Sequence, residues 1–187
     1  MKDVKIIALV GMPGSGKGTC TDYLHEKYGY PVVHFGNMVY EEVQRRGLDN
    51  VKDEKFVRED MRKQEGSAVL AKHASKKADD YLANNLETVV FDGLYSWSEF
   101  KYLSKKYGSS LLVIAVAAPR QERYRRILDR HDSHRKYKSP DQIEERDIAE
   151  IENLEKGGPI AFADYTIVND KTLDDMLIKL KSIIENQ

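Results

Sequence analysis

The segment GMPGSGKGT, residues 11–19, constrains this chain more than any other part of its sequence. It follows residues 5–10, an apolar run with the length of a buried parallel strand. It leads into residues 17–28, a polar stretch with a helical pattern that stops at Gly29. A glycine-rich loop between a buried strand and a helix predicts a backbone that curls around an anionic ligand.

The loop has the spacing Gly11-x-x-x-x-Gly16-Lys17, which is the phosphate-loop pattern. Its glycines let successive N–H groups converge on phosphate oxygens, and the following helix directs its positive end to the same place. Lys17 adds a full charge near the β- and γ-phosphates. A dinucleotide-binding loop fits poorly, because Thr19 stands where that pattern needs a third glycine. The residues expected to hold the phosphates of a nucleotide are Gly11, Pro13, Gly14, Ser15, Gly16, Lys17, Gly18 and Thr19.

The bulk composition limits the partners of the protein. The 187 residues suffice for one domain with a substantial core. A net charge of −1, from 30 basic and 31 acidic residues, gives no support to bulk electrostatic binding of nucleic acid or anionic membrane. The single cysteine, Cys20, excludes an intrachain disulfide, and the first residues lack the pattern of a signal peptide. These features predict one cytoplasmic domain over residues 1–187, and they do not determine its oligomeric state.

Apolar runs and helical patterns alternate along the rest of the chain. This order predicts a parallel sheet with helices on both faces, a three-layer α/β/α fold. Two charged helices, at residues 53–64 and 67–84, are expected to form a solvated layer. Capping signatures begin helices at Ser96 and Ser139. The strands are expected at residues 5–10, 31–35, 88–91, 111–117 and 165–168, and the other helices at 17–28, 37–46, 97–107, 139–154, after 119 and after 173.

The form G-x-P-G-x-G-K-G-T resembles the P-loop nucleoside monophosphate kinase family, which includes the adenylate kinases. This resemblance implies that the loop binds ATP and that Mg²⁺ lies against a hydroxyl and an acidic residue. The hydroxyl is that of Thr19, one position after Gly18. The acidic residue is Asp92, since Asp92-Gly93 matches the family's Asp-Gly pair at the end of a strand.

The segment 163–170, ADYTIVND, resembles the last strand and loop of dephospho-coenzyme A kinases and of a related group of adenylate-kinase-like proteins. The resemblance implies that the loop after this strand borders the adenine, which makes Asn169 a candidate nucleotide contact.

Five arginines are candidates to neutralise charge during phosphoryl transfer. Arg123, Arg126 and Arg130 share one face of the helix after Pro119, and the resemblance places the last two where the family's lid begins. Arg135 and Arg146 match the pair on the far side of that lid. The alternative is a solvated basic face that nearby acidic residues balance.

The acceptor side departs from the family pattern. Asn37 replaces the aspartate of the usual Gly-Asp pair, and Tyr40 and Tyr95 stand where two arginines usually clamp the acceptor's phosphate. Two lost charged contacts would weaken phosphate binding by roughly 1.5–3 kcal/mol each. Either Arg58 or Arg62 supplies the charge, or the acceptor is not a simple monophosphate. The candidate acceptor-binding residues are Phe35, Gly36, Asn37, Tyr40, Arg58, Arg62, Gly93 and Tyr95.

These observations predict a P-loop kinase with a five-stranded parallel sheet. Its core is expected at residues 1–36, 85–130 and 143–187, with a helical acceptor-binding insertion at 37–84 and a short lid at 130–142. The expected reaction is Mg²⁺-dependent transfer of the γ-phosphoryl group of ATP to a small acceptor such as a nucleotide. Three alternatives stay open: a dephospho-coenzyme A kinase-like enzyme, a kinase of nucleosides or other alcohols, and an ATPase or nucleotide-dependent binding module.

Overall fold

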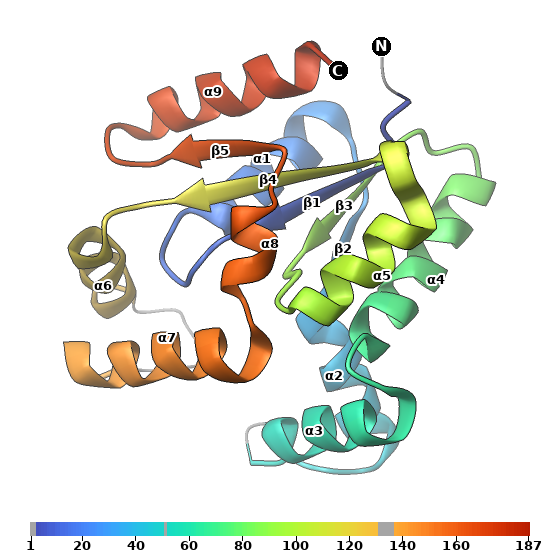
Figure 1. Ribbon diagram of the computed structural model, residues 1–187, viewed down its shortest axis with the longest axis vertical. Helices are drawn as coiled ribbons and strands as arrows, with labels where there is room; N and C mark the ends of the chain where they lie inside the picture. The colour runs from blue at the N-terminus through green and yellow to red at the C-terminus, as the bar shows by residue number, and fades with distance from the viewer. Residues whose placement is uncertain (1–2, 51, 131–136) are drawn as a thin grey trace.

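The computed structural model describes residues 3–50, 52–130 and 137–187. A parallel sheet of five strands, in the order β2-β3-β1-β4-β5, forms the centre of this part of the chain (Figure 1). Helices pack on both faces of the sheet, so the predicted three-layer α/β/α fold is confirmed. The strands are β1 Ile6–Val10, β2 Val32–His34, β3 Val89–Asp92, β4 Leu111–Ala117 and β5 Tyr165–Val168.

The central strand β1 explains the apolar run before the glycine loop. Ile6 pairs with Val89 of β3 on one side and with Leu111 of β4 on the other, and all five residues of β1 are buried. A strand that is covered on both faces needs apolar side chains in both directions, which removes the alternation of a half-exposed strand. The loop that follows β1 therefore starts from the middle of the sheet.

Two hydrophobic clusters cover the two faces. The first joins one face of the sheet to α1 and α9, through residues such as Leu24 and Met176. The second joins the other face to α2, α3, α4 and α5, through residues such as Val57, Leu70 and Leu103. Figure 1 shows α9 on one side of the sheet and α4 and α5 on the other. The helices are α1 Lys17–Tyr28, α2 Phe35–Arg45, α3 Glu54–Glu65, α4 Val69–Ala83, α5 Trp97–Tyr107, α6 Arg120–Leu128, α7 Pro140–Leu154, α8 Gly157–Ala161 and α9 Leu173–Glu185.

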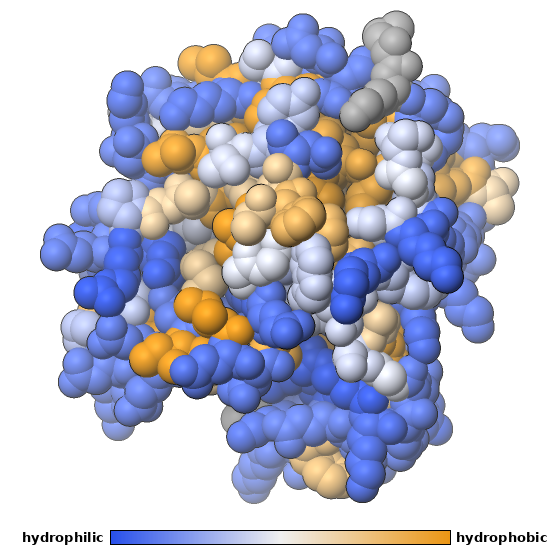
Figure 2. All heavy atoms as spheres, in the orientation of Figure 1, coloured by the Kyte–Doolittle hydropathy of each residue, from blue (hydrophilic) through white to orange (hydrophobic). Residues whose placement is uncertain are grey.

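Helices α2, α3 and α4 follow one another between β2 and β3, where the sequence predicts an insertion. The expectation of a solvated layer is wrong for α4, which buries six of its residues against α2, α5 and the sheet. The expectation describes α3 better, because this helix buries only Val57 and Met61 and most of its other residues are charged. In Figure 2 the end of the molecule that carries α3 is mostly hydrophilic.

The structure corrects the sequence prediction at two elements. The second strand ends at His34, because Phe35 begins α2 and packs its ring against Phe91 at 5.5 Å between centroids. The short helix α8 was not predicted, since Gly157, Gly158 and Pro159 are residues typical of turns. The capping box of Ser96 and Glu99 is confirmed at the start of α5.

Among the described residues, no helix has both the length and the apolar character that crossing a bilayer requires. The single cysteine, Cys20, is buried as a free thiol. The predicted lid at 130–142 lies in part outside the described residues, at 131–136.

Candidate functional site

A cavity of about 440 Å³ lies at the carboxyl ends of β1 and β3. This is the edge at which open parallel sheets bind ligands. The glycine loop forms one side of the cavity with residues Gly11, Met12, Pro13, Gly14, Ser15, Gly16, Lys17 and Gly18. The rest of the lining comes from residues Gly36, Val39, Tyr40, Glu54, Arg58, Arg62, Leu70, Asp92, Tyr95, Ile127, Arg130, Tyr137, Arg146, Glu150, Leu154 and Lys156.

The conformation of the loop explains its glycines. Gly14 has φ +77° and Gly16, the N-cap of α1, has φ +104°, values in the region that other residues seldom adopt. A Cβ atom on Gly14 would lie 2.6 Å from the carbonyl oxygen of Arg123. A Cβ atom on Gly16 would lie 2.4 Å from Nδ2 of Asn169. Both backbone angle and space therefore require glycine at these two positions.

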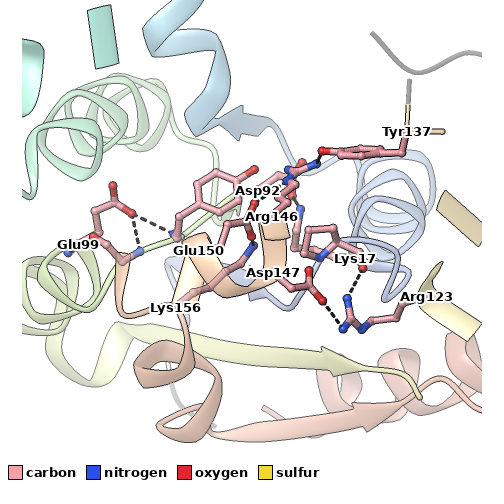
Figure 3. A network of polar contacts seen from close by, with 12 residues as sticks. Lys17, Asp92, Glu99, Arg123, Tyr137, Arg146, Asp147, Glu150 and Lys156 are labelled. Atoms are coloured by element: carbon pink, nitrogen blue, oxygen red, sulfur yellow. Dashed lines mark hydrogen bonds and ion pairs between the residues drawn. The ribbon is translucent and has the colours of Figure 1, made fainter. Parts of the chain in front are cut away.

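Two predicted site residues hold this loop from behind. Arg123, which is 7% exposed, donates from Nη1 to the carbonyl oxygen of Pro13 at 2.9 Å and from Nη2 to Asp147 at 2.6 Å (Figure 3). Asn169 donates from Nδ2 to the carbonyl oxygen of Ser15 at 2.8 Å. Neither residue lines the cavity. Arg123 was expected near the transferred phosphate. In the structure its guanidinium instead pairs with Asp147 and holds the glycine loop through the carbonyl oxygen of Pro13.

Lys17 and Asp92 meet at the centre of the site and form an ion pair. His34 donates from Nδ1 to the other oxygen of Asp92 at 3.0 Å. Burial raises the pKa of the Asp92 carboxyl, but the His34 hydrogen bond and the Lys17 charge outweigh it and lower that pKa to about 2. For Lys17, burial lowers the pKa, but Asp92 outweighs it and leaves that pKa raised. Both groups are therefore charged at neutral pH, and each is the other's partner.

The remaining arginines predicted for the transferred phosphate differ in their placement. Arg130 and Arg146 line the cavity, and Arg146 donates from Nη1 to the Tyr137 hydroxyl at 2.6 Å. Arg126 donates to the carbonyl oxygen of Asn169 at 3.2 Å, outside the cavity lining. Arg135 lies outside the described residues.

The structure divides the eight candidate acceptor residues. Gly36, Tyr40, Arg58, Arg62 and Tyr95 line the same cavity as the glycine loop. The other three do not. Phe35 is fully buried in the core, Asn37 is exposed, and Gly93 has φ +100° in the turn that brings Tyr95 into place.

Arg58 and Arg62 lie one turn apart on α3. Arg58 donates to Glu54 at 2.6 Å, which makes an ion pair within the helix. Arg62 lies 3.7 Å from Oε1 of Glu99, whose other oxygen accepts hydrogen bonds from the backbone N–H groups of Tyr95 and Ser96. Burial lowers the pKa of Arg62 and raises that of Glu99. Arg58 and Arg62 therefore bring positive charge into the wall of the cavity.

Sequence reasoning missed five polar or charged residues of this site: His34, which contacts Asp92, and Glu54, Tyr137, Glu150 and Lys156, which line the cavity. Glu150 accepts from Nε of Arg146 at 2.8 Å and forms an ion pair with Lys156. Burial raises the pKa of Glu150, but the charges of Lys156 and Arg146 outweigh it and leave that pKa lowered. The helical spacing of Arg146 and Glu150 was a usable signal, whereas nothing in the sequence marks Lys156.

Of the two residues predicted to hold Mg²⁺, Asp92 fits that role and Thr19 does not. Among the described residues, no group of three or more His, Cys, Asp or Glu side chains could hold a metal ion. A protein cage is not required for Mg²⁺, which proteins commonly bind through one or two carboxylates together with phosphate oxygens. Asp92, beside the glycine loop, meets that description. Thr19 is exposed on α1 and does not line the cavity.

The sequence is similar to that of proteins from several organisms along almost its full length. It is 34% identical over 184 residues to a UPF0200 protein of Thermococcus onnurineus, which covers 96% of each chain. It is 33% identical over 184 residues to a UPF0200/UPF0201 protein of Archaeoglobus fulgidus, which covers 97% of this chain and 55% of that protein. The chain belongs to the UPF0200 family.

Other comparisons place this UPF0200 chain among P-loop folds. A profile described as an AAA domain matches residues 10–144, from the end of β1 into α7. A crystal structure from Thermus thermophilus has a TM-score of 0.67 at 22% identity and covers 99% of this chain and 98% of that one.

Two kinases share the same architecture. A shikimate kinase from Bacteroides thetaiotaomicron has a TM-score of 0.59 at 13% identity, over 97% of both chains. A gluconokinase from Sinorhizobium meliloti has a TM-score of 0.57 at 15% identity, over 100% of this chain and 97% of that one. The chain therefore has a P-loop kinase-like fold.

Proposed function

We propose that the protein transfers the γ-phosphoryl group of Mg-ATP to a small acceptor, a nucleotide or a nucleotide-like compound. The observation that carries this proposal is one continuous cavity. It joins the glycine loop, with Lys17, to two arginines on α3, with Arg130 and Arg146 also in its wall. A volume of about 440 Å³ lies within the range of small-ligand sites, and both substrates of a transfer reaction can meet at its centre.

The donor half supports ATP binding. The loop and the first residues of α1 line the cavity, and backbone N–H groups at a helix N-terminus favour phosphate groups such as the β- and γ-phosphates of ATP. Lys17 supplies the full positive charge, and it would exchange Asp92 for phosphate oxygens when the nucleotide binds. Asp92, released from that pair, is the residue that would hold Mg²⁺. The metal supplies charge neutralisation on the β- and γ-phosphate oxygens.

The acceptor half supports a small and polar second substrate. Tyr40 and Tyr95 can each donate one hydrogen bond from a hydroxyl, and Arg58 and Arg62 add positive charge on the same side. Arg130 and Arg146 would stabilise charge on the phosphoryl group as it moves, because oriented cations in a site with little water lower the barrier to transfer. Two structures of the same fold are a shikimate kinase and a gluconokinase, which supports a small acceptor.

The test is a panel assay that reads products by mass. The protein is incubated with Mg-ATP and, one at a time, with each nucleoside monophosphate, nucleosides and dephospho-coenzyme A. A phosphorylated acceptor is the expected product. ATP hydrolysis without transfer to any compound would overturn the proposal in favour of an ATPase or a nucleotide-dependent binding module.

Lys17→Ala tests the donor half by itself. Loss of a cation that contacts the transferred group should lower turnover by about a hundredfold to a thousandfold. Lys27→Ala is the matched control, because Lys27 is an exposed lysine near the other end of the same helix. Equal turnover of the two variants would contradict the assignment of the loop.

A further inference from the structure

Lys156 is a buried cation in the wall of the cavity, over the ring of Tyr95. It lies in the turn between α7 and α8, is 2% exposed and belongs to the cavity lining. Glu155 just before it has φ +52°, a left-handed conformation that residues other than glycine seldom adopt. This turn directs the Lys156 ammonium back to Glu150, which accepts a hydrogen bond from it. Backbone strain beside a cavity points to a function for the side chain that it positions.

Lys156 also lies over Tyr95, the residue that stands where the monophosphate kinases have their second arginine. Its Nζ is 4.7 Å from the centroid of the Tyr95 ring. The backbone N–H of Tyr95 donates at 2.9 Å to Glu99, whose other oxygen faces Arg62 at 3.7 Å. Position 95 therefore has one cation against its ring and a second beside the carboxylate that holds its backbone. Lys156 and Arg62 therefore supply positive charge close to position 95, where the side chain itself is neutral.

The same neighbourhood extends to the glycine loop. Burial is the largest effect on Lys156 and lowers its pKa, Glu150 opposes it, and the charges of Lys17 and Arg146 lower that pKa further. Figure 3 shows these side chains converging on one region with Asp92. The cavity lining among the described residues holds three carboxylates and six cations, namely Lys17, Arg58, Arg62, Arg130, Arg146 and Lys156. This excess favours an anion in addition to the donor nucleotide.

We propose that Lys156 binds a phosphate group of the acceptor, beside Tyr95. This role rests on the proposed function and narrows it, because an acceptor with a phosphate is neither a neutral nucleoside nor a simple alcohol. An ammonium group has three donors, and among the described residues Glu150 accepts one of them. The other two donors can serve a bound phosphate without breaking the ion pair.

The experiment measures binding with the donor site filled. The full chain is saturated with Mg²⁺ and a non-hydrolysable ATP analogue, and inorganic phosphate, AMP, adenosine and acetate are then titrated by calorimetry. The wild-type protein should bind inorganic phosphate or AMP more tightly than adenosine. Lys156→Met should weaken the binding of the phosphate compounds by roughly tenfold to a hundredfold, which is the worth of one hydrogen bond to a charged group. Lys156→Arg should retain most of that affinity, and adenosine should bind equally to all three proteins.

A double variant separates binding from folding. Lys156→Met leaves Glu150 as a partly buried charge with less compensation, which can destabilise the protein by itself. Adding Glu150→Gln removes that charge, so the double variant should melt at a higher temperature than Lys156→Met. Its phosphate affinity should stay low. Recovery of phosphate affinity in the double variant would show that Lys156 only neutralises Glu150, and would overturn the proposal. Lys101→Met, an exposed lysine on α5, controls for the loss of one charge.

The remaining outcomes also decide the role of Lys156. Wild-type protein that binds no phosphate compound, or that binds acetate as tightly as phosphate, would overturn it. Unchanged phosphate affinity in Lys156→Met would do the same even if the panel assay shows transfer. Absence of transfer in that assay would instead overturn the proposed function. The titrations would still show whether Lys156 binds phosphate, because they do not depend on transfer.

Discussion

The two halves of the cavity are built in different ways. The proposed donor half is one continuous segment, residues 11–18, whose shape depends on backbone angles and on hydrogen bonds to backbone carbonyl groups. The proposed acceptor half is assembled from side chains on α2, α3, the turn after β3, and the α7–α8 turn. A half made of backbone tolerates little local change, whereas a half made of side chains can alter its ligand through single substitutions. The two halves should therefore fail differently when they are perturbed.

The largest expected effect is on the donor half, from Gly14→Ala. The new Cβ atom would meet the carbonyl oxygen of Arg123 at 2.6 Å in a residue with φ +77°. Left-handed strain of about 1–2 kcal/mol and the clash with backbone together should lower the free energy of unfolding by about 3 kcal/mol. Gly18→Ala is the matched control, since its Cβ atom would meet nothing within 4 Å. Urea denaturation checks both, and an unchanged midpoint for Gly14→Ala would contradict the described loop.

The second expected effect is the pH dependence of the Asp92 carboxylate, whose pKa the His34 hydrogen bond and the Lys17 charge lower. The Asp92 pKa is lowered from 3.8 to about 2 in the folded protein, so its contribution to stability is present above about pH 4 and is lost as the pH falls toward 2. The contribution should amount to about 2 kcal/mol. Asp92→Asn should thus be less stable than wild type at pH 6, and the gap should close near pH 2. A gap that does not depend on pH would argue against a charged pair.

The third expected effect is confined to the acceptor half. Arg62→Met should raise the KM of the phosphorylated acceptor by about tenfold, because a charged hydrogen bond is lost. The KM of ATP should change little, since Arg62 lies on α3 and pairs with Glu99 at the start of α5. Lys63→Met, at the next and exposed position of α3, should leave both constants unchanged. A similar rise in both constants for Arg62→Met would show that the two halves are not separable.

The smallest expected effect is a gain. Tyr40→Arg places a full charge at the position that resembles the arginine of the monophosphate kinases, and it should improve the use of monophosphates by a few fold. Asn37→Arg is its control, because Asn37 lies one turn earlier on α2 and is exposed outside the lining. Steady-state kinetics with the acceptor from the panel compares the two. Equal gains from both variants would mean that general positive charge, and not position 40, is responsible.

The difference between the halves also decided how much the sequence could predict. The sheet, the succession of strands and helices apart from α8, and the glycine loop follow from local patterns such as the apolar run of β1 and the spacing of Gly11, Gly16 and Lys17. These patterns lie within a few residues of the structure that they determine. The placement of Lys156 over Tyr95 depends instead on how α8 packs against the rest of the domain, and no pattern near position 156 contains that information.

Two side chains lie away from the positions expected of them, for the same physical reason. Arg123 was assigned by helical spacing to the transferred phosphate, but Asp147 on α7 pairs with it and its side chain reaches Pro13 instead. Phe35 was assigned to the acceptor because it precedes Gly36, but its ring lies in the core against Phe91. In both cases tertiary contacts with distant residues determine where the side chain points.

The ion pair between Lys17 and Asp92 has a thermodynamic consequence under the proposed function. ATP alone would bind Lys17 through its phosphates and leave the Asp92 carboxylate, without its partner, close to phosphate oxygens. Mg²⁺ alone would bind Asp92 and leave the Lys17 ammonium without its carboxylate partner. When both ligands are present, each compensates the charge that the other releases. Nucleotide and metal should therefore bind with positive coupling, and by linkage each should raise the affinity of the other by the same factor.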